Sequence, residues 1–297
     1  MKKLLGILFF YIILVVLLLP LLVTLLCGGF GKNLPQEAKV LYDTRYLAPL
    51  NSELEEYVVG VVAAEMPAVF PEEALKAQAV AARTYQVRQM QAAGTDQVLY
   101  DVGQAYITTA EQQKRWGENY PFHAGKIRKA VQDTAGEIMV YEGEPILAAF
   151  HAQSAGRTED AVHVWNREVP YLQSVDSSGD KKAPQHKTTI VFSEKDLKEK
   201  LGSADTKILS RTDAGTVLEM QAGKAVFTGR EVREKLDLRS ANFEIKEKGE
   251  AIVFTTYGYG HGVGMSQYGA SFLAEEGKKY HEILRYYYQG IDFRKME

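Results

Sequence analysis

The chain has 297 residues, of which 46% are hydrophobic and 25% are charged, so it is long enough for one or two globular domains. Its formal net charge of −3 argues against a nucleic-acid binder, because binding to phosphates requires a basic surface. The one cysteine, Cys27, excludes an intrachain disulfide, a cysteine nucleophile in the rest of the chain and a zinc site built on thiolates.

The N-terminus predicts a membrane anchor. Two lysines precede an uncharged run rich in leucine, valine and isoleucine at residues 4–26, which is long enough to span a bilayer as a helix. A cleaved signal peptide is the alternative, but the run exceeds a usual signal-peptide core, no A-x-A-like site follows, and Cys27 matches a lipoprotein site poorly. We therefore expect residues 1–30 to form a cytoplasmic N-terminus and a single transmembrane helix, with the remaining residues outside.

Residues 51–66 predict a helix that carries a carboxylate in an apolar run. Ser52 and Glu55 have the spacing of a capping box, and Pro67 ends the helix. Glu65 then lies in the last turn, where the helix carbonyls and apolar neighbours disfavour a charged carboxylate and raise its pKa. A raised carboxyl pKa suits a general acid, although a glutamate that turns to solvent at a helix end is an equally simple interpretation.

A second, alanine-rich helix is predicted from Pro71, at its first position, to Gly94. Its small side chains allow close packing inside a domain. Arg83 shares a face with Val80 and Val87, so its guanidinium either reaches the surface or binds a polar group.

The residues around and after this helix predict a mixture of strands, a loop and a further helix. The predicted elements are strands at residues 38–47 and 98–100, a loop at 101–106, a helix at 125–134, and a hairpin of strands at 138–141 and 146–150. The hairpin leads into a polar loop at residues 151–159, and a strand end is a common place for binding groups.

From residue 187 the pattern changes to short strands with one or two short helices. The expected strands are residues 187–192, 207–211, 217–221, 225–228, 243–245 and 252–256. Residues 187–250 are interpreted as a smaller inserted lobe, between a first core part at 31–186 and a closing part at 251–297. The expected fold class is α+β, with an N-terminal transmembrane helix, a mixed α/β catalytic domain and a smaller inserted β-rich lobe.

The segment YGYGHGVGMSQYGA at residues 257–270 runs from a predicted strand into a predicted helix, and its five glycines allow a contorted backbone that can press against a ligand. The spacing differs from the phosphate-binding pattern G-x-G-x-x-G, so a nucleotide site is not indicated. His261, Ser266 and Gln267 are suited to hydrogen-bonding the hydroxyls and amides of a sugar.

Two other kinds of catalytic site receive little support from the sequence. A serine triad needs Ser154 or Ser266, and neither serine lies in the motif G-x-S-x-G. A metal site built from histidines lacks a helix with the spacing H-x-x-x-H. His151 and His261 are the histidines considered for the triad, and His123, His151, His163 and His261 are those considered for the metal site.

Three segments together resemble one protein family. They are EEYVVGVVAAEMP at residues 55–67, LKAQAVAARTY at residues 75–85 and GHGVGMSQYGA at residues 260–270. With these segments in this order, the chain resembles the stage II sporulation protein D (SpoIID/LytB-domain) family over nearly all of its length after the predicted anchor.

The resemblance implies a membrane-anchored lytic transglycosylase that cuts peptidoglycan glycan strands between N-acetylmuramic acid and N-acetylglucosamine during forespore engulfment in sporulation. It implies that Glu65 is the catalytic acid and that Arg83 lies nearby in the cleft. By the same carry-over, the substrate groove is lined by Gln104, Tyr106, His151, Ser154, Gly156, Arg157, Thr158, Tyr171, His261, Gly262, Ser266 and Gln267.

The resemblance also implies partners and a location. The partners are peptidoglycan glycan strands and stage II sporulation proteins P and M. The enzyme is expected to act on strands from which protein P has removed the stem peptides. The catalytic domain faces outward from the mother-cell membrane at the septum. Some relatives hold zinc with histidine and cysteine near the position of residues 101–106, but here Gly103 precedes Gln104 and Cys27 is the only thiol, so we expect no metal and no other cofactor.

The expected mechanism needs one carboxylate. An ordinary glycosidase uses two, whereas here the C6 hydroxyl of the muramic acid acts as the nucleophile and a 1,6-anhydro product forms. Arg83 is permanently charged and so suits a positioning role better than proton donation. The alternative function is a non-catalytic glycan-binding scaffold that enhances a cell-wall amidase, and release of anhydro-sugars distinguishes the two.

Overall fold

A computed structural model of the chain describes residues 47, 50, 52–249 and 251–296. These residues belong to one compact unit, Thr44–Glu297. The predicted transmembrane helix at residues 4–26 and nearly all of the predicted strand at residues 38–47 lie outside the described residues. Among the described helices, none is long and apolar enough to cross a membrane.

The helix predicted around Glu65 is confirmed as α4 (Glu53–Glu65). It begins where the Ser52 side chain accepts a hydrogen bond from the Glu55 backbone N–H, which satisfies one of the free donors of the first turn. It ends directly before Met66 and Pro67, because proline cannot continue a helix.

The alanine-rich helix is confirmed as α5 (Glu72–Ala93), which ends at Gly94 with a left-handed φ of 65°. Pro71 is the N-cap residue, whereas the sequence predicted it at the first helical position, so the helix begins one residue later than predicted. The alanines and valines of α4 and α5 are almost fully buried and share one hydrophobic core. This packing fixes the helix that ends at Glu65.

The chain then forms α6 (Thr109–Trp116), a 3₁₀ turn (Gly117–Asn119) and α7 (Tyr120–Asp133). The predicted helix at residues 125–134 is therefore confirmed but starts earlier, because a proline in its first turn favours helical geometry. The predicted strand at residues 98–100 is wrong, since these residues form an irregular loop.

The core contains short strands and four further helical segments. In one sheet, β1 (Glu137–Tyr141) pairs with β2 (Glu144–Pro145) and β11 (Asp292–Lys295), and in another, β3 (Phe150–His151) runs parallel to β10 (Met265–Ser266). A hairpin therefore follows β1 as predicted, but its second strand is Glu144–Pro145, and the predicted strand at residues 146–150 is wrong except for Phe150, which begins β3. The helical segments are α8 (Ala161–Trp165), a 3₁₀ segment (Ser178–Lys182), α11 (Gln267–Glu275) and α12 (Tyr280–Tyr287).

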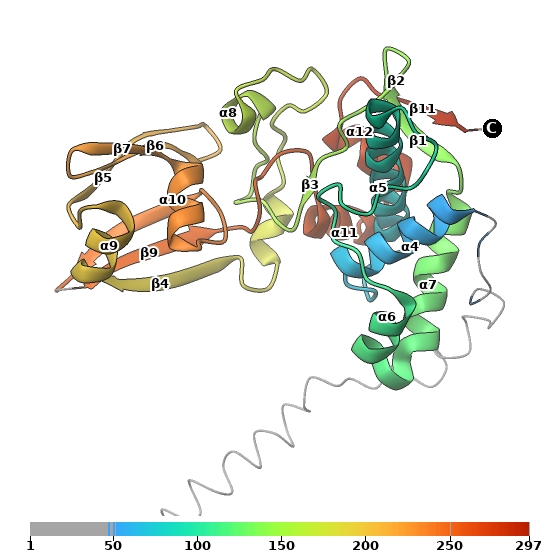
Figure 1. Ribbon diagram of the computed structural model, residues 1–297, viewed down its shortest axis with the longest axis horizontal. Coiled ribbons are helices and arrows are strands. Elements are labelled where there is room, and N and C mark those ends of the chain that lie inside the picture. The colour runs from blue at the N-terminus through green and yellow to red at the C-terminus, as the bar shows by residue number, and fades with distance from the viewer. Residues whose placement is uncertain (1–46, 48–49, 51, 250, 297) are drawn as a thin grey trace, which may run out of the picture. The chain divides into compact units, whose positions relative to one another are not determined.

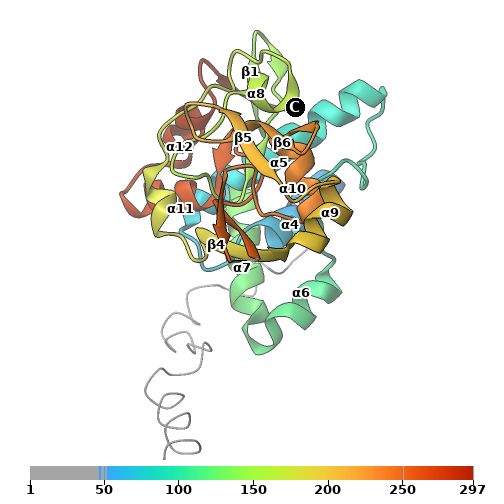
Figure 2. The same ribbon diagram turned by 90° about the vertical axis from the view of Figure 1, so that its left-hand side faces the viewer.

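The predicted strands after residue 187 are confirmed. They form one sheet of β4 (Lys187–Ser193), β9 (Ala251–Tyr257) and β8 (Phe243–Lys248), and one sheet of β5 (Thr206–Arg211), β6 (Val217–Ala222) and β7 (Ala225–Thr228). Helices α9 (Glu194–Leu201) and α10 (Gly229–Leu236) pack with these strands around a separate hydrophobic core (Figure 2). Because β9 is the middle strand of its sheet, the lobe's sheet extends beyond residue 250.

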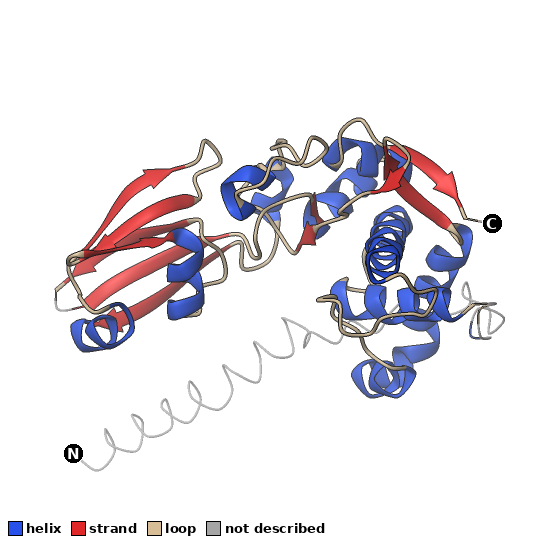
Figure 3. Ribbon diagram, turned by 45° about the horizontal axis from the view of Figure 1, so that its top comes forward, coloured by secondary structure: helices blue, strands red, loops and turns tan. Residues whose placement is uncertain are grey.

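The described residues thus form a mixed α/β structure with several small sheets. Figure 1 shows α4, α5, α7, α11 and α12 gathered together, while the strands of the lobe lie with α9 and α10. The colouring by secondary structure in Figure 3 makes the same division visible. The last turn of α4 and the first turn of α11 meet inside the helical part, and this meeting point holds Glu65.

Candidate functional site

Glu65 is the last residue of α4 and is half-buried. Its carboxylate accepts hydrogen bonds from the Ala105 backbone N–H (3.1 Å to Oε1) and from the Gln267 side-chain amide (3.3 Å to Oε2). Burial raises the pKa of Glu65, and the two hydrogen bonds oppose this rise. The raised pKa has the direction expected from the sequence, and it suits a group that donates a proton.

Two glutamines complete the buried side of this carboxylate. Gln267, the first residue of α11, is 4% exposed, and its Nε2 lies 3.4 Å from Oε1 of the fully buried Gln78 of α5. Buried amides need partners, so each fixes the orientation of the next. Side chains from α4, α5 and α11 therefore converge at Glu65.

The loop at residues 98–107 lies against α4 and covers the other side. The Tyr106 ring stacks on the Tyr57 ring at 5.6 Å with an interplanar angle of 8°, and the Tyr57 hydroxyl donates to Gln104 Oε1 at 3.2 Å. Gly60 makes this approach possible, since a Cβ there would lie 2.2 Å from Tyr106. The contact places the N–H of Ala105 on Glu65.

Arg83 is not brought to Glu65. It is fully buried, and its Nε and Nη2 donate to the two carboxylate oxygens of Glu55 at 2.8 and 2.6 Å. Glu55 precedes Glu65 by ten residues, which is about 15 Å along a helix. The expectations that Arg83 lies in the cleft, or reaches solvent, are therefore corrected: Arg83 ties the start of α4 to α5.

A buried carboxylate, Asp180, ties three segments together. It accepts hydrogen bonds from the Ser154 backbone N–H (2.7 Å), the Ser154 hydroxyl (2.6 Å) and the Ser266 hydroxyl (2.8 Å). Ser266 also caps α11 by accepting from the Gly269 N–H at 3.1 Å. Both serine hydroxyls thus donate to a carboxylate, and this arrangement ties the start of α11 to the 151–159 loop and to the 3₁₀ segment.

His151 and His261 are held by the backbone carbonyl and the backbone N–H of one residue, Val263. His151 Nδ1 lies 3.1 Å from the Val263 carbonyl oxygen, to which it must donate, and the Val263 N–H donates to His261 Nδ1 at 3.0 Å. Burial lowers the pKa of His151 to about 3 and that of His261 to about 4. Both rings are therefore neutral and oriented by the backbone.

Other residues expected in the groove are engaged within the chain. The Tyr171 hydroxyl accepts from the Leu147 N–H, and Thr158 pairs with the backbone of Val175. The remaining contacts are Gly156 N–H to Ser154 Oγ, Arg157 Nε to Ser174 Oγ, and Glu159 N–H to the Gly262 carbonyl. These contacts shape the 151–159 loop.

The glycines of the 257–270 segment allow neighbouring parts of the chain to pack closely against its backbone. A Cβ at Gly264, where φ is 72°, would lie 2.1 Å from the Ala149 carbonyl oxygen. A Cβ at Gly269 would lie 2.0 Å from the Tyr287 hydroxyl oxygen. At both positions only glycine fits the observed packing.

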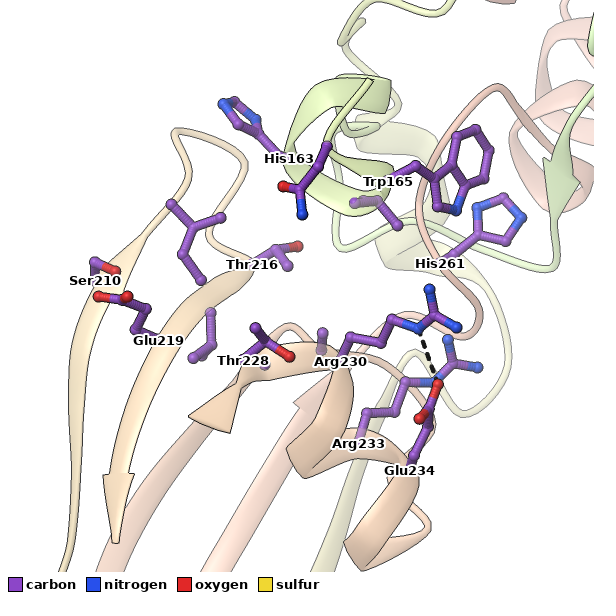
Figure 4. A pocket seen from close by; sticks show the side chains of 16 residues that line it. His163, Trp165, Ser210, Thr216, Glu219, Thr228, Arg230, Arg233, Glu234 and His261 are labelled. Carbon is purple, nitrogen blue, oxygen red and sulfur yellow. Dashed lines mark hydrogen bonds and ion pairs between the residues drawn. The ribbon is translucent and has the colours of Figure 1, made fainter. Parts of the chain in front are cut away.

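A cavity of about 740 Å³ lies near His261 but is not lined by Glu65 (Figure 4). Its walls come from α8, β6 and α10. In the described part of the chain, no group of three or more histidine, cysteine, aspartate or glutamate side chains is arranged to hold a metal ion.

Comparison with known proteins agrees with the three motifs. The family model described as SpoIID, stage II sporulation protein, matches residues 42–141. The chain is 46% identical over 270 residues to stage II sporulation protein D of Bacillus subtilis (strain 168), an alignment that covers 86% of this chain and 79% of that protein. The chain belongs to the stage II sporulation protein D family.

Two further relatives bear on this family assignment. Stage II sporulation protein D of Bacillus amyloliquefaciens is 44% identical over 270 residues, covering 86% of this chain and 78% of that protein. A Bacillus subtilis (strain 168) protein named amidase enhancer is 29% identical over 294 residues, covering 78% of this chain and 39% of that protein. The resemblance stated from the sequence is therefore confirmed at the level of the family.

Within this stage II sporulation protein D family member, the structure brings Gln104, Tyr106 and Gln267 to the surroundings of Glu65. Sequence reasoning missed Gln78 and Asp180. Gln78 carried a usable signal, since it is a polar residue inside an alanine-rich helix, whereas Asp180 lies in a polar stretch with no pattern. The Ala105 N–H could not be foreseen, because any residue type except proline supplies it.

Proposed function

We propose that this chain is a membrane-anchored lytic transglycosylase that cuts the bond between N-acetylmuramic acid and N-acetylglucosamine in peptidoglycan glycan strands. The observation that carries the proposal is the setting of Glu65, a half-buried carboxyl group with a raised pKa whose two partners, Ala105 and Gln267, are neutral. Membership of a sporulation family supports the cell wall as the substrate.

In the proposed reaction, one carboxyl group acts twice. Protonated Glu65 gives its proton to the bridging oxygen as the glycosidic bond breaks. The carboxylate then takes the proton of the C6 hydroxyl of the muramic acid, whose oxygen bonds to C1 of the same sugar. A 1,6-anhydro ring forms without water, so no second carboxylate is required.

Neutral partners suit this double role. The Ala105 and Gln267 N–H groups stabilise the carboxylate that the first proton transfer produces, while burial keeps its pKa raised so that the acid form is available again. A cation bound directly to Glu65 would hold the group ionised and remove the proton to be donated. The location of Arg83 at the other end of α4 meets this requirement.

Location and partners are part of the proposal. Residues 4–26 would anchor the protein with its compact unit on the outer side of the mother-cell membrane at the engulfing septum. The substrate would be glycan strands freed of stem peptides, and the partners would be stage II sporulation proteins P and M.

The test uses the full chain in detergent with purified peptide-free glycan strands, and mass spectrometry of the products. Glu65→Gln keeps the size and one hydrogen-bond acceptor but not the transferable proton, so release of 1,6-anhydro-muramic ends should fall about 100-fold or more. Glycan binding should stay intact. Glu275→Gln is the matched control, because Glu275 is also the last residue of its helix but is exposed.

Release at a near wild-type rate by Glu65→Gln would show that another residue is the acid. A second candidate function, an enhancer of a cell-wall amidase, is favoured by the relative of that name. It predicts that neither wild type nor Glu65→Gln releases anhydro ends, while both bind glycan and stimulate a purified amidase.

A further inference from the structure

The cavity of about 740 Å³ shown in Figure 4 belongs to both parts of the compact unit. Its volume is within the range of about 300–1,000 Å³ that ligand pockets have. Trp165 of α8 and His261 come from the core, whereas β6 and α10 come from the lobe. Neither Glu65 nor Gln267 lines it, so the proposed chemistry does not use it.

One end of the cavity is cationic. Arg230 and Arg233 lie three residues apart on α10 and therefore on one face of the helix, and both guanidinium groups extend toward His261 (Figure 4). Arg230 Nε pairs with Glu234 at 2.9 Å, while Arg233 forms no ion pair within the described residues. Only the Arg230 guanidinium is thus paired with a carboxylate.

The wall facing these arginines is neutral and aromatic. The Trp165 and His261 rings lie 5.4 Å apart. Burial and, to a smaller extent, the nearby Arg233 lower the pKa of His261 to about 4, so this imidazole adds no charge near pH 7. The indole offers a flat apolar face, on which the C–H face of a saccharide ring can pack.

The opposite end of the cavity offers hydrogen-bond acceptors. Ser210, Thr216 and Glu219 lie there, away from the two arginines (Figure 4). Hydroxyl oxygens and a carboxylate accept hydrogen bonds from sugar hydroxyl or amide groups. The cavity thus combines a site for an anion, a flat wall, and acceptors for several donors.

We propose that this cavity binds a saccharide unit that carries a carboxylate, with the carboxylate on Arg233 and Arg230, the ring against Trp165 and the hydroxyl groups toward Glu219. Guanidinium groups bind carboxylates through two parallel hydrogen bonds, which gives the arginine end its selectivity. The site goes beyond the proposed cleavage, since it needs no reaction at Glu65.

The experiment follows Trp165 fluorescence in the full chain carrying Trp116→Phe, which leaves Trp165 as the only tryptophan, because the chain has two. The probes are N-acetylmuramic acid and N-acetylglucosamine, which differ only in the lactyl group that bears the carboxylate. N-acetylmuramic acid should change the fluorescence in a saturable way and bind at least tenfold more tightly than N-acetylglucosamine.

Arg233→Gln should weaken binding of N-acetylmuramic acid at least tenfold and leave binding of N-acetylglucosamine nearly unchanged. Lys235→Gln is the matched control: it removes a positive charge from the same helix, outside the cavity lining, and should bind like wild type. If Arg233→Gln does not fold, Arg230→Gln provides the same comparison.

Equal affinity for the two sugars, no saturable signal with either, or unchanged N-acetylmuramic acid binding in the arginine variants would overturn the proposal. Glu65→Gln should bind both probes as wild type does. Failure of cleavage at Glu65 and failure of this site are therefore measured separately.

Discussion

Arg83→Gln should destabilise the fold rather than impair chemistry at Glu65. Arg83 is 0% exposed, and besides its two hydrogen bonds to Glu55 it donates to the backbone carbonyls of Glu137 (3.0 Å) and Val131 (3.3 Å). Glutamine is too short to reproduce these contacts. The Glu55 carboxylate would stay buried without its cation, and breaking a buried pair in this way costs about 3–5 kcal/mol.

That loss is a large part of the about 5–15 kcal/mol by which a protein is stable. With a urea slope of roughly 2–3 kcal/mol per molar, the unfolding midpoint, followed by circular dichroism, should fall by roughly 1–2.5 M. Cleavage per folded molecule should change little. Arg285→Gln is the control, since Arg285 is exposed on α12 and its loss should shift stability by less than about 0.5 kcal/mol.

A double variant separates charge from packing. Arg83→Met combined with Glu55→Met removes both charges and keeps apolar volume, so it should recover much of the stability lost in Arg83→Gln. The reasoning is refuted if Arg83→Gln unfolds at the wild-type midpoint yet loses cleavage, because Arg83 would then act at the site itself.

Gly60→Ala should lower the rate of cleavage about tenfold or more and shift the pH–rate profile to higher pH. The added methyl group would displace Tyr106, and the Ala105 N–H would then move away from Glu65. Because that hydrogen bond opposes the rise in the pKa of Glu65, its loss raises this pKa further. A profile unchanged in position would contradict this link. Glu65→Gln should raise the free energy of unfolding at pH 7, because a pKa raised by burial makes ionisation costlier in the folded state than in the unfolded one. The gain should vanish below about pH 4, where Glu65 is protonated in both states, and urea unfolding at the two pH values measures it.

The helices and strands that the sequence predicted correctly are those with strong local signals. α4 begins at a serine cap and ends before a proline, and α5 ends at Gly94, so their bounds depend on residues within a few positions. The lobe's strands likewise follow short apolar runs separated by turns. In each case the residues that start or end the element lie next to it in the chain, so the sequence alone reveals them.

The parts that the sequence did not predict depend on distant contacts. Arg83 lies 28 positions from Glu55, and Ser266 lies 86 positions from Asp180. Periodicity placed Arg83 on a face of its helix but could not say whether that face met a carboxylate, a groove or water. The loop at residues 98–107 has no regular structure because its conformation is set by packing on Gly60 and Tyr57.

The glycine-rich segment contributes to the Glu65 site by positioning Gln267. Gln267 reaches Glu65 from 202 positions away because β10, directly before it, pairs with β3, and Gly264 lets this pairing form against the Ala149 carbonyl. Gly264→Ala should therefore lower stability and cleavage together, since β10 and the start of α11 must both shift. Gln267→Ala removes only the amide, so cleavage should fall with a much smaller loss of stability. If the two variants lose cleavage with the same small change in the unfolding midpoint, the glycine acts on the substrate directly and the positioning role is wrong.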